Sequence, residues 1–206
     1  PRYFNLGPLT IHFYGLIIAT GLILAVVYAL ARKEQFGISE DDLMDGVLWI
    51  APFAIVCARL YYCAFEWERY ASNPISILYI WEGGLAIYGA VIGAAIGIII
   101  HCKLIKKISV LAVLDVASLG FMIGQMLGRW GNFFNREAFG GYTDGLFAMQ
   151  LPVSAVRSGE ITEQMWENLE VINGIEFIQV HPTFLYEGLW NVGVIIFLYL
   201  YRKHKK

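Results

Sequence analysis

The sequence predicts an all-α integral membrane protein with about five transmembrane helices and a small extracytoplasmic insert. Of its 206 residues, 58% are hydrophobic and only 16% are charged, whereas a soluble domain usually carries roughly a quarter charged residues. The apolar residues gather in runs long enough to cross a bilayer, which takes about 20 residues per helix. This composition argues against a soluble globular protein.

Five apolar runs define the predicted spans. They cover residues 13–31, 44–64, 84–101, 110–128 and 184–201. We interpret the first run as a true span, because no basic segment or small-residue cleavage site marks it as a removable signal peptide.

The segment between the fourth and fifth spans is polar and rich in glutamate. We expect it to form a water-exposed head with a short helix within 160–169. The predicted domains are a membrane region at 1–128, an extracytoplasmic head insert at 129–183, and a fifth span with a basic cytoplasmic tail at 184–206.

The lysines predict the orientation of the chain. All of them lie after the first, third and fifth spans, at Lys33, within 103–107 and within 203–206. The positive-inside rule makes these segments cytoplasmic, so the N-terminus, the 65–83 loop and the head insert face outward. The net charge of −2 provides no basic excess for binding nucleic acid.

Small residues inside the spans predict close helix packing. Two glycine ladders occur, at Gly89, Gly93 and Gly97 and at Gly120, Gly124 and Gly128. Spacing by four places each ladder on one helix face, where two backbones can approach closely. If the two ladders pack against each other, Arg129 becomes a neighbour of Tyr88. The cysteines Cys57, Cys63 and Cys102 lack metal-ligand spacing, and we interpret them as reduced packing residues.

The densest polar cluster follows directly on the fourth span. Residues 128–140 read Gly-Arg-Trp-Gly-Asn-Phe-Phe-Asn-Arg-Glu-Ala-Phe-Gly. If the helix continues, Arg129, Asn132 and Arg136 share one face. A guanidinium at this depth suits a phosphate, because its planar fork of N–H donors binds phosphate oxygens in pairs. The alternative, equally supported by the spacing, is a structural clasp in which Arg129 pairs with Glu137.

Two other segments place polar groups at the outer ends of spans. Gly83 and Gly84 permit an unusual backbone before the third span and leave amides that favour an anion, although a plain turn is the more frequent explanation. Glu187 stands just inside the fifth span, where a carboxylate needs a partner or a function. For Arg59 and Asp115 an internal ion pair or a snorkelled end is the favoured explanation.

The residues of these motifs resemble those of a known family, the bacterial prolipoprotein diacylglyceryl transferases. Gly128–Gly140 fits the family signature at every defined position. Trp81–Gly89 is similar to the family's glycine-pair motif, and Ala58–Tyr62 resembles its second-span motif. His181–Glu187 resembles the His-Pro…Leu-Tyr-Glu motif before its fifth span. The motifs occur in the family's order and cover about residues 7–200.

The resemblance implies an outward-facing, multi-pass enzyme of the bacterial cytoplasmic (inner) membrane. Such enzymes move a diacylglyceryl group from phosphatidylglycerol to the lipobox cysteine thiol of a preprolipoprotein and release glycerol phosphate. The implied partners are therefore phosphatidylglycerol, lipobox peptides and membrane lipid. Neither a metal, nor another cofactor, nor nucleic acid is implied.

The same resemblance assigns roles to individual residues. Arg129 binds the lipid phosphate, and Asn132 and Glu137 complete the polar site. Tyr14, in the first span, matches a functional tyrosine, and Gly140 shapes the chain beside the site. The motifs supply the remaining substrate-binding candidates Gly83, Gly84, Asn135, His181, Tyr186 and Glu187.

Two departures from the family pattern leave the mechanism open. Tyr88 stands where the family often carries a histidine assigned as a base, and a phenol of pKa about 10 is a poorer base near neutrality. Tyr88, His181, Glu187 and the phosphate itself remain candidate proton acceptors. The family also continues past its fifth span, so we expect this chain, which ends at Lys206, to lack two further spans.

Two other classes of function remain beside the transferase. A non-catalytic lipid-binding or scaffold fragment would keep the site without transferring lipid. A small transporter would use Arg59, Asp115 and Glu187 as charges near the bilayer midplane. Against transport, the polar residues gather at one interface and no internal repeat is evident.

Overall fold

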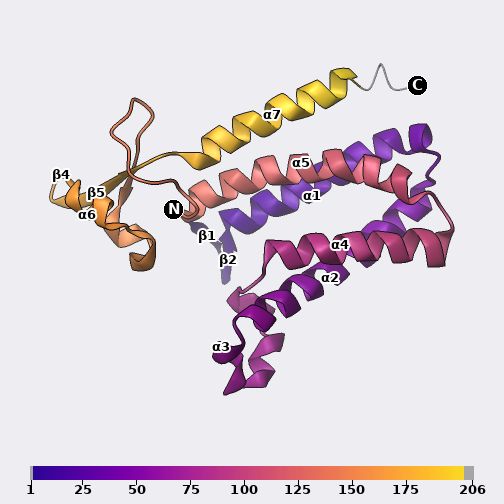
Figure 1. Ribbon diagram of the computed structural model, residues 1–206, viewed down its shortest axis with the longest axis horizontal. Coiled ribbons are helices and arrows are strands. Elements are labelled where there is room, and N and C mark those ends of the chain that lie inside the picture. Colours follow the sequence, from indigo (N-terminus) through magenta and orange to yellow (C-terminus); the bar gives the residue numbers. More distant parts are fainter. Residues whose placement is uncertain (1, 202–206) are drawn as a thin grey trace. The chain divides into compact units, whose positions relative to one another are not determined.

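The computed structural model describes residues 2–201 and confirms the predicted fold class. Within this range, five helices are long and apolar enough to cross a membrane. They are α1 (Phe13–Arg32), α2 (Glu40–Phe65), α4 (Ile87–Ile100) with its π-helical extension η4 (His101–Lys106), α5 (Val110–Asn135) and α7 (Thr183–Tyr201) (Figure 1). The predicted basic tail at 203–206 lies outside the described residues.

Local signals explain why two helices begin away from the predicted positions. α2 begins at Glu40 rather than 44 because Ser39 caps it, with the Ser39 Oγ accepting a hydrogen bond from the Asp42 N–H at 3.0 Å. α4 begins at Ile87 rather than 84 because Gly84 has a φ of 72°, which no right-handed helix contains.

The chain divides into two compact units, which we describe in turn. Unit 1 comprises Pro1–Ala25 with Leu119–Lys206, and unit 2 comprises Val26–Ser118. Unit 1 therefore holds the signature segment and α7, whereas unit 2 holds α2, α4 and the glycine pair. The functional division at 128 and 183 into membrane region, head and final span stays a prediction.

In unit 2, the glycine ladder of α4 lies against α2. Gly89, Gly93 and Gly97 are all buried. A Cβ atom on Gly89 would stand 2.6 Å from the carbonyl oxygen of Cys57, and one on Gly93 would stand 2.5 Å from the Cys57 Cβ. The two backbones therefore approach as closely as predicted, with Cys57 as a packing residue.

The rest of unit 2 supplies the connections of this helix pair and ion pairs at one of its ends. η1 (Lys33–Phe36) links α1 to α2, and α3 (Trp67–Ala71), η2 (Pro74–Leu78) and η3 (Ile80–Glu82) link α2 to α4. At the opposite end of the pair, the Lys106 Nζ lies 3.1 Å from Asp42 Oδ1 and 2.6 Å from Asp45 Oδ2. The α2–α4 pair is thus joined by packing along its length and by ion pairs where α2 begins.

In unit 1, the second glycine ladder packs against α1. A Cβ atom on Gly21 would lie 3.6 Å from the Gly124 Cα, and one on Gly120 would lie 3.2 Å from the Ala25 Cβ. Figure 1 shows α1 and α5 side by side. Within unit 1, the partner of this ladder is therefore α1, through the small residues Gly21 and Ala25.

An N-terminal hairpin precedes α1 and is absent from the sequence predictions. β1 (Tyr3–Leu6) and β2 (Leu9–His12) pair antiparallel, and Gly7 turns the chain with a φ of 62°. The Arg2 Nη2 donates a hydrogen bond to the carbonyl oxygen of Ala155. The hairpin is therefore tied to the head.

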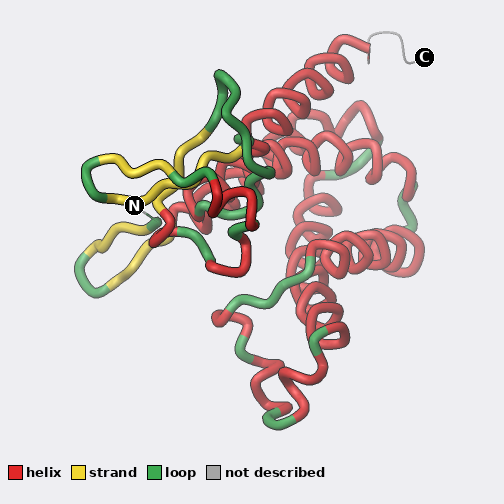
Figure 2. Tube along the Cα trace, turned by 60° about the vertical axis from the view of Figure 1, so that its left-hand side comes forward, coloured by secondary structure: helices red, strands yellow, loops and turns green. Residues whose placement is uncertain are grey.

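The head contains a three-stranded antiparallel sheet and a short helix. The sheet has the order β3-β5-β4, formed by Met149–Pro152, Ile175–Val180 and Glu170–Ile172. α6 (Glu163–Glu167) falls inside the predicted helical stretch at 160–169, and the turns η5 (Val153–Ala155) and η6 (Ser158–Glu160) precede it. Figure 2 shows the strands gathered at one end of the helices of unit 1.

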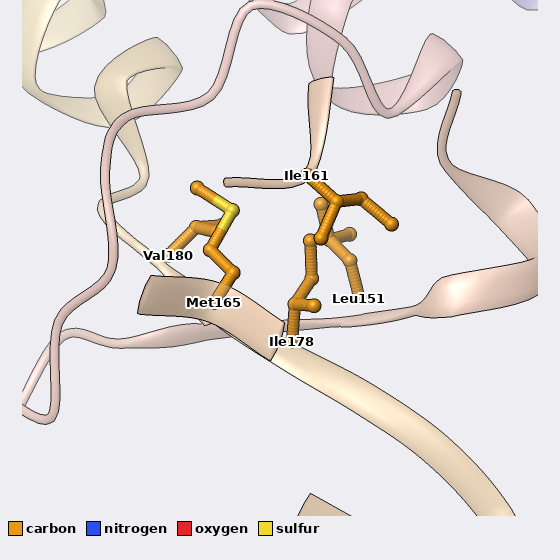
Figure 3. Close-up of a cluster of buried hydrophobic side chains, with 5 residues drawn as sticks. All are labelled: Leu151, Ile161, Met165, Ile178 and Val180. Atoms are coloured by element: carbon orange, nitrogen blue, oxygen red, sulfur yellow. The ribbon is translucent and has the colours of Figure 1, made fainter. Parts of the chain in front are cut away.

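The head has a hydrophobic core of its own. Its side chains point toward one another and come from Leu151, Ile161, Met165, Ile178 and Val180 (Figure 3). Large apolar side chains on the helices are instead exposed, as at Leu22 and Ile23 of α1. This contrast is what a bilayer requires, because lipid covers the outer faces of spanning helices.

Substitution of the α4 glycines tests the helix packing. We predict that Gly89→Ala lowers the free energy of unfolding by about 1–3 kcal/mol, since its Cβ overlaps the α2 backbone. Gly124→Ala is the matched control, because a Cβ there meets no atom within 4 Å. Thermal unfolding in detergent measures both, and equal stability of the two variants would contradict the proposed contact.

Candidate functional site

The signature segment begins inside α5 and leaves it through a tight turn. α5 continues past 128 to Asn135. The Arg136 N–H then donates to the Phe133 carbonyl oxygen at 3.1 Å, and the Glu137 N–H donates to the Asn132 carbonyl oxygen at 3.1 Å. This hydrogen-bond pair is the Schellman motif, which usually has glycine where Arg136 stands.

Two residues of this turn have strained backbones. Arg136 has a φ of 57° and Ala138 has a φ of 52°, and the left-handed region costs a residue with a Cβ roughly 1–2 kcal/mol. The predicted helix face is therefore only partly right: Arg129 and Asn132 lie on α5, but Arg136 is beyond its end. Strain of this kind is often retained where a backbone must hold a functional group.

The chain after the turn is hydrogen-bonded to the segment at the start of α7. The Gly140 N–H donates to the His181 carbonyl oxygen at 2.9 Å, and the His181 N–H donates to the Gly141 carbonyl oxygen at 3.0 Å. The Thr183 Oγ1 donates to the Ala138 carbonyl oxygen at 2.6 Å. A Cβ on Gly140 would lie 2.7 Å from the His181 Cβ, which explains the glycine. The structure thus brings two predicted motifs together.

Arg129 faces α7 and forms an ion pair there. Its Nη2 lies 2.6 Å from the Glu187 Oε2, and the two side chains are 27% and 43% exposed. The rings of Trp130 and Phe184 meet edge to face beside this pair, with centroids 5.2 Å apart. Glu187 therefore has the partner that its position required, whereas the predicted clasp between Arg129 and Glu137 does not form.

Glu137 instead contacts its own turn and the head. The Asn135 Nδ2 donates to Glu137 Oε1 at 3.1 Å, and the Arg157 Nη2 lies 3.3 Å from Glu137 Oε2. Arg157 also lies 3.4 Å from Glu160. Arg157 thus serves Glu137 and Glu160, whereas Arg129 pairs with Glu187.

Tyr14 lies against the signature from α1. A Cβ on the buried Gly131 would stand 2.7 Å from the Tyr14 Cδ2, so the ring occupies the space that a side chain would need. Arg129 and Glu137 are both close enough to act electrostatically on the Tyr14 hydroxyl. Within residues 2–201, Asn132 makes no side-chain hydrogen bond, so its amide is available beside these groups.

His181 and Tyr186 form a second polar contact at the start of α7. The His181 Nδ1 lies 3.3 Å from the Tyr186 hydroxyl, and their ring centroids are 6.0 Å apart. Both side chains are exposed. Unit 1 therefore gathers Arg129, Asn135, Glu137, Gly140 and Tyr14 with the predicted residues of the α7 motif.

Arg59, in unit 2, has different partners from those that the sequence predicted. Its side chain is only 4% exposed, so it is not a snorkelled end, and it forms no ion pair with any residue of the described range 2–201. It donates hydrogen bonds to the carbonyl oxygens of five residues of the α2–α4 connection: Ser76, Ile77, Tyr79, Gly83 and Gly84. The physical reason is that this connection folds back over the end of α2 and supplies carbonyl dipoles in place of a carboxylate.

The glycine pair is shaped by Arg59. A Cβ on Gly84 would lie 2.5 Å from the Arg59 Nη1, and the Gly83 N–H is used in a bond to the Ile80 carbonyl oxygen at 3.3 Å. Arg59 and both glycines line a pocket of about 100 Å³ together with Arg69, Tyr70 and Ser76. An anion-binding role for the amides of Gly83 and Gly84 stays a prediction.

Tyr70 adds a ring to the surroundings of Arg59. The guanidinium carbon lies 5.2 Å from the Tyr70 ring centroid. Burial raises the pKa of the Tyr70 phenol, against the opposing effect of the nearby Arg59 charge. The phenol therefore stays neutral and stabilises the guanidinium through its ring face rather than through a negative charge.

Tyr88, the candidate base, lies in the first turn of α4 in unit 2. Its side chain is 70% exposed and its ring centroid is 6.5 Å from that of Tyr61. Its chemical role stays a prediction.

Sequence reasoning missed Arg157 and mispredicted the partners of Arg59. Arg157 lies in the polar head without a motif, so only the fold reveals that it pairs with Glu137. A weak sequence signal for the carbonyl contacts of Arg59 did exist. It is an arginine near the end of an apolar run that is followed by a connection rich in turns.

The fold and the site define a polytopic membrane protein with an arginine-centred polar site where α5 and α7 meet. The family model described as prolipoprotein diacylglyceryl transferase matches residues 1–206. The chain therefore belongs to the prolipoprotein diacylglyceryl transferase family.

Several curated bacterial relatives support this assignment, and each is named phosphatidylglycerol–prolipoprotein diacylglyceryl transferase. The protein from Lysinibacillus sphaericus is 43% identical over 97% of this chain and 70% of its own length. The protein from Bacillus cytotoxicus is 42% identical over 97% and 69%. The Staphylococcus aureus protein is 40% identical over 100% and 69%. The relatives are thus longer than this chain.

The contact between the signature and the α7 motif can be tested at Gly140. We predict that Gly140→Ala speeds amide hydrogen exchange in residues 138–143 by about tenfold, because its Cβ displaces His181 and weakens the hydrogen bonds between the segments. Gly141→Ala is the control, since a Cβ there meets no atom within 4 Å. Unchanged exchange in the Gly140 variant would contradict the tight contact.

Proposed function

We propose that this chain transfers the diacylglyceryl group of phosphatidylglycerol to the thiol of a lipobox cysteine. The observation that carries the proposal is the position of Arg129, beside Tyr14, Asn132 and Glu187 in a member of this transferase family. In the reaction a carbon–sulfur bond forms at the glycerol carbon while its bond to the phosphate oxygen breaks. Glycerol phosphate leaves with the bonding electron pair, and the thiol loses its proton.

Arg129 meets the main electrostatic demand of this reaction. Negative charge develops on the leaving phosphate, and a guanidinium placed there in advance stabilises it. Glu187 orients this guanidinium toward α7, with 2.6 Å between Arg129 Nη2 and Glu187 Oε2. In the proposed complex with lipid, phosphate oxygens take the place of the Glu187 carboxylate on the guanidinium.

Three neighbours complete the polar site in this proposal. Asn132 supplies an uncommitted amide one turn from Arg129 on the same helix face. Tyr14 brings its phenol from α1 against Gly131 of the signature. Glu137 orients the turn through Asn135 and the head through Arg157, so we assign it to positioning rather than to phosphate binding.

The thiol must lose its proton, because the thiolate is the nucleophile. Four acceptors remain candidates: Tyr88, His181, Glu187 and the phosphate itself. The carboxylate that phosphate binding releases from Arg129 lies in the α7 motif with His181 and Tyr186. This favours Glu187 or His181 as the acceptor within unit 1, while Tyr88 stays a candidate in unit 2.

The proposed location is the bacterial cytoplasmic membrane, with the N-terminus and the head outside the cytoplasm. The support is the lysine distribution, which places the loops after α1 and α4 inside. The lipobox cysteine of an exported preprolipoprotein then reaches the site at the outer surface of the membrane, at the depth of the lipid headgroups. A lipid-binding fragment without transfer activity is the alternative.

We predict that Arg129→Ala abolishes diacylglyceryl transfer and that Arg129→Lys retains little or no activity. A lysine supplies the charge but lacks the bidentate fork, so it is no conservative change at a phosphate site. The measurement is transfer from phosphatidylglycerol to a lipobox peptide, with Arg32→Ala as the arginine control. Near wild-type turnover by the Arg129→Ala variant would refute the role of Arg129.

We also predict that single cysteines introduced within residues 160–170, in a background without Cys57, Cys63 and Cys102, react with membrane-impermeant reagents from the outer face. Because the head connects α5 to α7, its side fixes the orientation of both helices. Cysteines in the lysine loop at 103–107 serve as the opposite control. Labelling of the head only from the cytoplasmic face would reverse the topology.

A further inference from the structure

Asn191 is a buried polar residue that the proposed site does not use. It lies inside α7, is 4% exposed, and its Nδ2 has no hydrogen-bond partner among the described residues. A buried amide donor without a partner loses its hydrogen bonds to water and gains none in return, so it destabilises the fold. The interior of a bilayer holds no water that would bind it. An unpartnered donor at this place therefore requires an explanation.

Asn191 continues the face of α7 that meets the signature. Residues three and four positions apart on a helix share a face, so Asn191 follows Glu187 and Gly188. Glu187 pairs with Arg129 on this face, and a Cβ on Gly188 would lie 3.8 Å from the Trp130 Nε1. Four residues of helix advance about 6 Å, which places Asn191 about one turn further into the span than the ion pair.

This position matches the chemistry of a lipid whose phosphate is bound at Arg129. In a diacylglyceryl lipid, a few single bonds separate the phosphate from the nearest ester, and the ester lies on the acyl-chain side. The acyl chains extend into the span, in the direction that leads along α7 from Glu187 to Asn191. The ester carbonyl only accepts hydrogen bonds, and the Nδ2 group only donates them.

We propose that Asn191 binds an ester carbonyl of the diacylglyceryl group and so selects acyl lipids. The proposal rests on the proposed function, because it takes the phosphate position from Arg129. It adds a second point of recognition. Arg129 binds the charged end of the lipid, and Asn191 distinguishes an ester from an ether at the glycerol backbone.

The experiment compares binding of two lipids to the full chain in nanodiscs, diester phosphatidylglycerol and its dialkyl ether analogue, which lacks both carbonyls. We expect the wild-type chain to bind the diester about fivefold more tightly, the ratio that one neutral hydrogen bond gives. Asn191→Leu is expected to remove this preference while retaining or raising thermal stability, because it deletes a buried donor without a partner. Gln125→Leu, which replaces an exposed amide on α5, is expected to keep the preference.

Other outcomes would overturn the proposal. If Asn191 only joins α7 to another helix, Asn191→Leu lowers stability and leaves the diester preference unchanged. If the leucine side chain prevents folding, Asn191→Ala removes the amide with less bulk, and a preserved preference in that variant also refutes the proposal. Equal wild-type affinity for the two lipids refutes it directly.

A separate variant distinguishes failure of the proposal from failure of the proposed function. Arg129→Ala is expected to weaken binding of both lipids equally, because both carry the phosphate. If Arg129→Ala leaves both affinities unchanged, the phosphate site itself is wrong. If it weakens both while Asn191→Leu keeps the diester preference, the phosphate site stands and only the ester contact is refuted.

Discussion

Close contact between helix backbones is the constraint on which the rest of this structure depends. Spanning helices gain little from hydrophobic burial against each other, because lipid is as apolar as their side chains. Dense packing must replace that gain, and it is supplied where Gly89 and Gly93 meet α2 and where Gly21 meets Gly124 of α5. Each contact positions part of the polar chemistry, since α4 follows the glycine pair and α5 ends in the signature.

The backbone of the signature is strained at the turn that ends α5, and the chain after this turn is held by hydrogen bonds. Arg136 and Ala138 occupy left-handed conformations, and hydrogen bonds from Gly140 and Thr183 hold the following chain against the start of α7. The same attachment brings the end of α5 beside Glu187, so Arg129 finds its counter-charge. The geometry around the arginine thus follows from main-chain hydrogen bonds more than from side-chain contacts.

Composition and motif order predict the class and the five helices of this protein, because apolar length and glycine spacing are local properties of a sequence. The motifs also supply the candidate site residues, whose chemical roles stay predictions. The partners were harder to predict. Arg129 pairs with Glu187, although Glu137 is closer to it in the sequence. The turn at Arg136 directs Glu137 toward Arg157 instead. The partner of each ladder, the hairpin before α1 and the carbonyl contacts of Arg59 depend on tertiary folding, for which the sequence has no periodic signal.

Arg59 has a consequence for the biosynthesis of the chain. Its acceptors, the carbonyl oxygens at residues 76–84, follow α2 in the sequence and are therefore synthesised after it. Until they arrive, the arginine opposes insertion of α2 by a few kcal/mol if it enters the hydrocarbon. Once the connection folds around the guanidinium, this opposition disappears. The helical hairpin of α2 and α4, rather than either helix by itself, is thus the unit that the membrane insertion machinery must accept.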